Sequence, residues 1–348
     1  MADATDDDRH AWERRGTFAV ADGVHRIPLP LPGDGLKAVN VYAVEQPDGV
    51  ILVDAGWALG DARSDLEAGL AAIDRDLSEV RRVLVTHVHR DHYEQAVVLQ
   101  RELGTPIGLG LGERPSLEQL LEEPPGEHAP MMVRLRQAGA APLIAAVTRL
   151  HEQRRLDPDV AAPAWSLPDH WLTDGEVLAL EGRRLRVLHT PGHTQGHVCL
   201  VDEEAGLLFS GDHVLPHITP SIGFEQIPVE SALADYLASL ALVRGLPDLE
   251  MLPAHGPVRP TTHDRIDELL AHHEHRLRAT AKAVADGSAT AYEVARALGW
   301  TRRERAFDDL DAFNQMLAVN ETAAHLDVLV RRDELGVGEE DGVRRYRV

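Results

Sequence analysis

Short apolar runs alternate with polar and glycine-containing segments along most of the chain. The early runs have the length and the β-branched content of strands, and they cover residues 24–29, 39–44 and 50–53. A more polar segment with several alanines follows at residues 63–72 and predicts a helix. Strands separated by helices predict a sandwich in which helices cover the sheets.

One loop concentrates side chains that bind metals. The run Thr86-His87-Val88-His89-Arg90-Asp91-His92 directly follows the apolar residues 83–85. A strand that ends in a tight loop can bring several imidazoles and a carboxylate around one small volume, and zinc and similar metals prefer these ligands. Taken alone, the run is also consistent with a solvated loop that is rich in histidine.

Three later residues repeat this arrangement. His193, Asp212 and His255 each come after a short apolar run and are flanked by glycine or proline. Such flanking residues let the backbone turn sharply and approach a buried centre. A single residue of this kind is usually a loop or capping residue, but several in one chain predict a shared site.

These ordered motifs resemble those of the metallo-β-lactamase-fold superfamily, over about residues 16–285. The resemblance implies an α+β fold, a four-layer αββα sandwich with the metals at one edge. It implies one metal held by His87, His89 and His193, a second held by Asp91, His92 and His255, a bridging Asp212, and an Asp54 that orients a ligand without binding metal.

The implied ligands predict hydrolytic chemistry. Two divalent cations about 3.5–4 Å apart can share a water and lower its pKa towards about 7. Asp91 is the candidate proton acceptor, with a purely ligating role as the alternative, and Asp212 is the second candidate catalytic residue. Because no protein nucleophile is needed, Cys199 in the apolar run 198–201 is interpreted as a core residue. We expect two divalent ions, zinc first, with manganese or iron as alternatives.

The residue at position 89 favours one class of reaction over another. Diiron flavoprotein relatives carry a carboxylate there, whereas this chain carries His89, which favours hydrolysis over redox chemistry. We expect a hydrolase acting on a small acyl substrate, such as a thioester, lactone or ester. The alternatives are a phosphodiesterase or endoribonuclease with the same metals, a mononuclear iron oxygenase, and a metal-dependent DNA-binding regulator.

Composition is typical of a soluble cytoplasmic enzyme. The chain has 348 residues, of which 44% are hydrophobic, enough for a sizeable core. Its net charge of −22 disfavours non-specific binding to nucleic acids or anionic membranes. Residues 1–15 are polar and are expected to form a disordered tail without an export signal, and nothing in the chain resembles a membrane span. The single cysteine excludes an internal disulfide.

Two segments extend the catalytic domain, which we place at residues 16–286. Residues 113–172 predict a helical insert, with two or three helices around Pro124-Pro125-Gly126, and we expect it to form a lid or wall over the metals. The alternatives for the insert are packing elsewhere and dimerisation, so a homo-oligomer is among the expected states.

Residues 287–348 predict a helix at 290–300, a longer helix and a hairpin, an order that resembles the winged-helix domain of one branch of the superfamily. Residues 288–348 hold nine arginines against twelve acidic residues, so we expect this segment to pack against the catalytic domain rather than bind nucleic acid. On the helix that precedes it, His272, His273 and His275 are interpreted as a solvated face.

Overall fold

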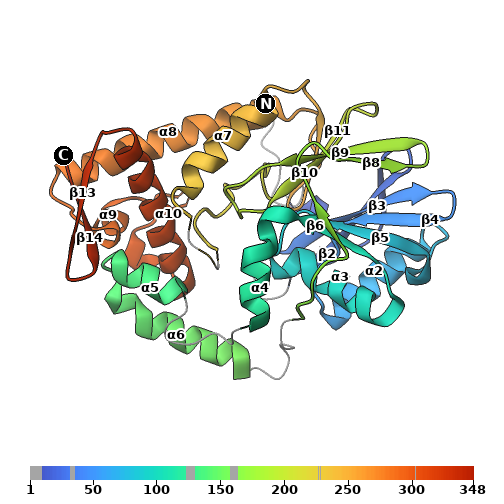
Figure 1. The fold of residues 1–348 in the computed structure, drawn as a ribbon, viewed down its shortest axis with the longest axis horizontal. Coiled ribbons are helices and arrows are strands. Elements are labelled where there is room, and N and C mark those ends of the chain that lie inside the picture. The colour runs from blue at the N-terminus through green and yellow to red at the C-terminus, as the bar shows by residue number, and fades with distance from the viewer. Residues whose placement is uncertain are drawn as a thin grey trace.

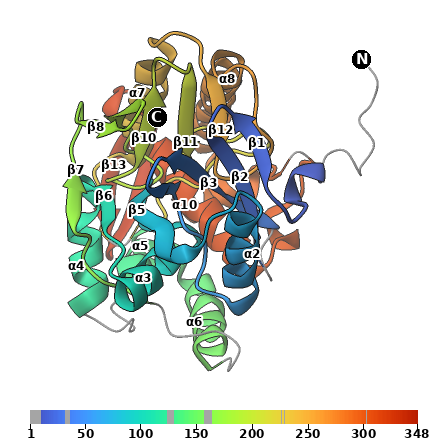
Figure 2. The ribbon, with the colours of Figure 1, turned by 90° about the vertical axis from the view of Figure 1, so that its right-hand side faces the viewer.

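Two β-sheets lie face to face, and helices cover their outer faces (Figures 1 and 2). The computed structural model describes residues 10–31, 36–122, 130–156, 164–225, 227, 229–301 and 303–348. One core cluster lies between the sheets and one lies on the outer side of each sheet. The expected four-layer αββα sandwich is confirmed.

The first sheet, as far as the structure describes it, has seven strands in chain order. Its first four strands pair antiparallel and the later ones parallel. The strands are β1 (Phe18–Ala21), β2 (Val24–Pro30), β3 (Ala38–Gln46), β4 (Gly49–Val53), β5 (Val80–Val85), β6 (Ile107–Gly110) and β7 (His170–Leu172). The three early strands expected from the sequence are confirmed as β2, β3 and β4.

The second sheet has the order β12-β11-β10-β9-β8 in the described part of the chain. Neighbouring strands pair antiparallel except β11 and β12, which are parallel. The strands are β8 (Val177–Leu180), β9 (Arg183–His189), β10 (Val198–Asp202), β11 (Leu207–Gly211) and β12 (Glu250–Pro253).

Strand β10 shows why these strands are apolar on both faces. Val198 and Leu200 point into the core between the sheets, whereas Cys199 and Val201 belong to the core under the outer helices. Successive side chains of a strand point to opposite faces, so a strand covered on both sides needs a continuous apolar run. Burial of each such side chain contributes about 1.5–3 kcal/mol. The expectation that Cys199 is a core residue is confirmed, because its side chain is fully buried.

Different helices cover the two sheets. Helices α2 (Gly60–Ala71) and α3 (Arg90–Leu103) pack on the first sheet, and α7 (Ala232–Arg244) and α8 (His263–Ala285) pack on the second. Short 3-10 helices connect some of these elements: η2 (Leu77–Glu79), η3 (Leu111–Glu113) and η4 (Phe307–Asp309).

The expected helical insert contains three helices in its described residues. They are α4 (Arg114–Glu122), α5 (Pro130–Gln137) and α6 (Ala141–Leu156), while Pro124-Pro125-Gly126 lies outside the described residues. Helices α5 and α6 pack against a C-terminal helix, α10 (Ala312–Arg331), at the end of the molecule away from the first sheet (Figure 1). The expectation that the insert forms a lid or wall over the metals stays a prediction. Residues 170–172 belong to the sandwich and not to the insert, because β7 pairs with β6.

The C-terminal segment has the expected order of two helices and a hairpin. It consists of α9 (Ala291–Ala297), η4, α10 (Ala312–Arg331), β13 (Gly336–Glu340) and β14 (Val343–Arg347). Its apolar residues share one core cluster with α5–α8 and the outer face of the second sheet, so it packs against the catalytic domain as expected.

The interpretation of His272, His273 and His275 as one solvated face is wrong for His273. Its side chain is fully buried between α8 and α10, and its Nδ1 lies 3.3 Å from His325 Nε2. The other two histidines are exposed.

The N-terminal segment is described only in part. Residues 1–9 of the expected tail lie outside the described residues, and the chain then forms the 3-10 helix η1 (Ala11–Glu13). The Trp12 carbonyl accepts a hydrogen bond of 2.7 Å from Arg26 Nη1. Among the helices that the structure describes, none is long and apolar enough to cross a membrane.

Candidate metal centre

The residues singled out in the sequence meet at one edge of the sandwich. Each follows the end of a strand: Asp54 follows β4, the histidine-rich loop follows β5, and His193, Asp212 and His255 follow β9, β11 and β12. Strands that run in the same direction end at the same edge of a sheet, which places these side chains together. All seven expected ligands fall into three overlapping groups whose ligand atoms lie within 4.8 Å of one another.

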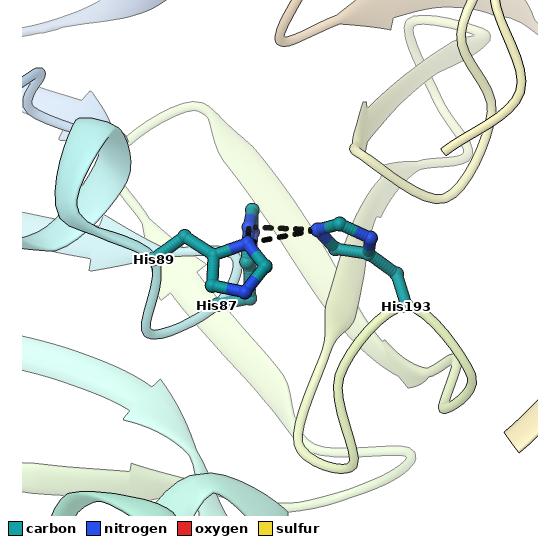
Figure 3. Close-up of side chains that lie close together, drawn as sticks. All are labelled: His87, His89 and His193. Atoms are coloured by element: carbon teal, nitrogen blue, oxygen red, sulfur yellow. Dashed lines mark hydrogen bonds between the residues drawn. The ribbon is translucent and has the colours of Figure 1, made fainter. Parts of the chain in front are cut away.

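Three histidines form the first group. His87 Nε2 lies 3.0 Å from His89 Nδ1, and His193 Nε2 lies 3.2 Å from the former and 3.0 Å from the latter. Figure 3 shows His193 approaching from the side opposite to His87 and His89, so that three ring nitrogens face one small volume.

The second group combines two histidines with Asp91. Its Oδ2 lies 3.3 Å from His255 Nε2 and 3.6 Å from His92 Nε2. Asp212 lies between the two groups, with Oδ1 3.4 Å from His255 Nε2 and Oδ2 3.5 Å from His193 Nε2. One carboxylate thus faces both groups.

The hydrogen bonds of the first group leave nitrogen lone pairs that point at each other. His193 Nδ1 donates to the Ser221 carbonyl at 2.8 Å, so its Nε2 carries a lone pair. Thr86 Oγ1 donates to Asp54, so His87 Nδ1, 3.1 Å from that hydroxyl, is the donor and its Nε2 also carries a lone pair. Two facing lone pairs 3.2 Å apart repel each other unless a cation lies between them.

The second group leaves buried polar atoms without partners in the described part of the chain. His92 Nδ1 donates to Asp54 Oδ2 at 2.9 Å, and His255 Nδ1 donates to the Ala38 carbonyl at 2.8 Å. The remaining Nε2 atoms of both histidines, and Asp212 Oδ1, are buried without a hydrogen-bond partner among the described residues. Buried polar atoms without partners are costly, and a divalent cation with nitrogen and carboxylate ligands would satisfy all of them. The donor set therefore fits a metal.

The pKa values of the side chains are shifted differently in the two groups of ligands. Burial, together with the neighbouring imidazoles, holds the pKa of His87 well below its usual value and lowers the pKa of His89 to about 3. Burial also lowers the pKa of His92, but the carboxylates of Asp54 and Asp91 outweigh it and raise that pKa to about 10. Burial raises the pKa of Asp91, yet His92 and His255 outweigh it and the net pKa is well below the ordinary value. The first group is thus neutral, and the second pairs imidazoles with an ionised carboxylate.

Asp54 contacts one expected ligand and the start of the histidine-rich loop. It accepts hydrogen bonds from the Thr86 N–H at 2.8 Å and the Thr86 hydroxyl at 3.0 Å, besides the bond from His92. Its backbone has φ 60°, a left-handed conformation that Asp tolerates better than most residues.

Some contacts of the site were not anticipated. His197 is buried and its Nε2 accepts from the Asp212 N–H at 3.1 Å. Glu113 is not among the site residues expected from the sequence, although its Oε1 accepts from the Thr194 hydroxyl at 2.5 Å and the Val88 N–H at 3.3 Å. Burial raises the pKa of Glu113 to about 7. Its local signal, a carboxylate in Gly-Leu-Gly-Glu after an apolar strand, matches that of the expected ligands.

Comparison with known proteins places this geometry in a family. Residues 34–255, more than half of the chain, match the Metallo-beta-lactamase superfamily. The chain belongs to that superfamily. Together with the His/Asp cluster, this membership makes it a metallo-beta-lactamase-fold hydrolase with a metal-binding site.

Three relatives illustrate the range of similarity. Lactamase-like protein nscB from Neosartorya fischeri is 31% identical, over 84% of this chain and 76% of the relative. An atrochrysone carboxyl ACP thioesterase from Paecilomyces divaricatus is 36% identical, but the chain spans only 36% of its length, with 34% of this chain aligned. The crystal structure of a metallo-beta-lactamase family protein from Thermus thermophilus has a TM-score of 0.73 and 28% identity, and covers 94% of this chain and 99% of its own.

The comparisons do not support the expected winged-helix identity of the C-terminal segment. The superfamily match ends at residue 255, and the relatives give no support for the branch that carries a winged helix. The segment is therefore described by its helices and hairpin alone.

Proposed function

We propose that this protein is a dinuclear metal-dependent hydrolase of small acyl substrates such as thioesters, lactones or esters. The observation that carries the proposal is the position of Asp212, whose two oxygens face different groups of ligand atoms. A carboxylate in this position is suited to bridging two cations.

The ligands would divide as the two groups do. His87, His89 and His193 would hold one ion, and Asp91, His92 and His255 the other, with Asp212 shared. When bound, two such ions supply an activated water and polarise the carbonyl group. Neutral imidazoles and carboxylates suit zinc, with manganese or iron as alternatives.

The chain's own residues would then position the ligands and move a proton. Asp91 stays ionised because His92 and His255 hold its pKa low, so its carboxylate is available to bind a cation. Its place among the ligands would also let it take a proton from water in the site. Asp54 would hold the His92 ring in the tautomer that presents Nε2, since the Nδ1 proton is bonded to its carboxylate.

Two observations support an acyl substrate. A relative that aligns with a third of this chain is named as an ACP thioesterase, and the net charge of −22 disfavours nucleic acid. The C-terminal hairpin also disfavours binding of nucleic acid, because two of its arginines pair with acidic side chains: Arg344 pairs with Asp327 at 2.7 Å and Arg345 with Glu340 at 2.5 Å. We infer that the segment is a structural support, whether or not its helix–helix–hairpin order proves to be of the winged-helix type.

The test is a panel of thioester, lactone and RNA substrates with zinc-loaded protein. We expect hydrolysis of thioesters or lactones with little dependence on salt, and at least about a 100-fold lower kcat/KM in Asp212→Ala. Asp267→Ala, at an exposed aspartate that pairs with Arg244 on the surface, is the control and should keep wild-type activity. Cleavage of RNA alone, consumption of oxygen, or full activity of Asp212→Ala would contradict the proposal.

A further inference from the structure

Glu113 lies between the two loops that carry the three-histidine group. Its side chain is fully buried, and one oxygen, Oε1, accepts from both the Val88 N–H and the Thr194 hydroxyl. Val88 separates His87 from His89, and Thr194 directly follows His193. A single carboxylate therefore contacts both loops next to their ligands.

Backbone packing between glycines brings Glu113 to this position. A Cβ on Gly110 would lie 1.9 Å from the Gly196 carbonyl oxygen, and a Cβ on Gly196 would lie 2.0 Å from the Glu113 nitrogen. These distances are far below van der Waals contact, so only glycine permits the approach. The segment after β6 is thus pressed against the turn after His193, and the Glu113 side chain enters between the loops.

The two loops come from different sheets, because one follows β5 and the other follows β9. A metal that needs all three histidines requires these loops to keep a fixed separation. We propose that Glu113 is a positioning residue that ties the loops together and thereby sets the metal affinity of the three-histidine group. This inference rests on the proposed dinuclear function.

The other half of the site has a separate support. Asn40 is fully buried, and its side-chain amide donates to the Pro253 and Gly256 carbonyls at 2.9 Å each, on either side of His255. Arg26 Nη1 donates to Asn40 Oδ1 at 2.9 Å. Since Asn40 and Glu113 hold different loops, their substitutions should weaken different metal ions.

The experiment measures zinc binding rather than activity. Metal-free full-length protein is titrated with Zn²⁺ in competition with a chromophoric chelator, which yields two dissociation constants. Glu113→Leu removes the acceptor at similar volume, Glu113→Gln retains an acceptor oxygen, and Asn40→Leu is the matched change at the other half. Thr194→Val removes the hydroxyl donor with little change in shape and reports on the same contact if Glu113→Leu fails to fold.

We expect Glu113→Leu to weaken one zinc ion by about 10–100-fold and to leave the other within about threefold. Thr194→Val should weaken the same ion, Glu113→Gln should bind nearly as the wild type does, and the Glu113→Leu/Asn40→Leu double variant should weaken both. Unchanged binding in Glu113→Leu, equal weakening of both ions, or a Glu113→Gln variant as weak as Glu113→Leu overturns the inference. A wild-type chain that fails to bind two zinc ions instead contradicts the proposed function.

Discussion

Asp54 offers a sharp test of how the site is held, because its side chain accepts three buried hydrogen bonds from two residues. The donors are the Thr86 N–H at 2.8 Å, the Thr86 hydroxyl at 3.0 Å and His92 Nδ1 at 2.9 Å. We consider the variant Asp54→Ala, which removes every acceptor and leaves the Thr86 N–H and His92 Nδ1 buried without a partner.

The expected loss follows from these bonds. A hydrogen bond to a charged group contributes about 1.5–3 kcal/mol. An alanine in the left-handed conformation at φ 60° costs about a further 1–2 kcal/mol. Since the hydroxyl can turn to another partner, two bonds count fully, and with the backbone cost we expect the free energy of unfolding to fall by about 4–8 kcal/mol. Zinc affinity should fall about 10–100-fold, because the His92 ring loses the partner that orients it.

The assay is urea unfolding of metal-free protein, followed by zinc titration. Asp74→Ala is a matched control, since Asp74 is exposed and has φ 56°, so that it carries the backbone cost without the buried bonds. Asp54→Asn should lose less stability than Asp54→Ala, because Asn tolerates the left-handed region and keeps one acceptor. The reasoning is refuted if Asp54→Ala unfolds within about 1 kcal/mol of Asp74→Ala and binds zinc as the wild type does.

Three further outcomes are expected. Gly196→Ala should lower thermal stability and activity, because its Cβ would lie 2.0 Å from a backbone nitrogen. The control Gly60→Ala has open space around its Cβ and should behave as the wild type does. Equal behaviour of the two variants would contradict the close approach at Gly196. Burial lowers the pKa of His325 to about 4 and that of His273 well below its usual value. The contribution of these neutral imidazoles to the free energy of unfolding should therefore be fully present above pH 6.5 and should be lost as the pH falls towards 4, by about 3 kcal/mol for His325 alone. Urea unfolding across this range should show a shallower decline in His325→Asn, and an unchanged slope would refute the assignment. Cys199→Ala should keep wild-type kcat/KM with a stability loss of about 1 kcal/mol, and a large loss of activity would reveal a nucleophile.

The metal ligands could be predicted from the sequence because their signal is local. Four ligands lie in the histidine-rich loop directly after an apolar run, and His193, Asp212 and His255 each stand after such a run beside glycine or proline. The parallel strands bring these strand ends to one edge. The role of Glu113 depends instead on contact between segments distant in the chain, at Gly110 and Gly196. No local pattern reports such a contact, although the run that carries Glu113 resembles those of the ligands.

The wrong interpretation of His273 has a physical reason of the same kind. His273 has polar neighbours, which suggested a solvated face, yet it lies on the helical face of Ile266, Leu269 and Leu277, and α10 covers that face. That periodicity was visible in the sequence. The insert helices were predictable from their apolar spacing, but their partner, α10, lies far along the chain, and amphipathic spacing shows only that a face is buried.

The central claim is that the clustered histidines and aspartates hold two divalent ions that share Asp212. Elemental analysis after equilibrium dialysis of wild type and Asp212→Ala against micromolar zinc tests it directly. The account predicts two zinc ions per wild-type chain and at most one in Asp212→Ala, since the variant loses the carboxylate that faces both groups. One ion or none in the wild type, or two ions retained by Asp212→Ala, would contradict it.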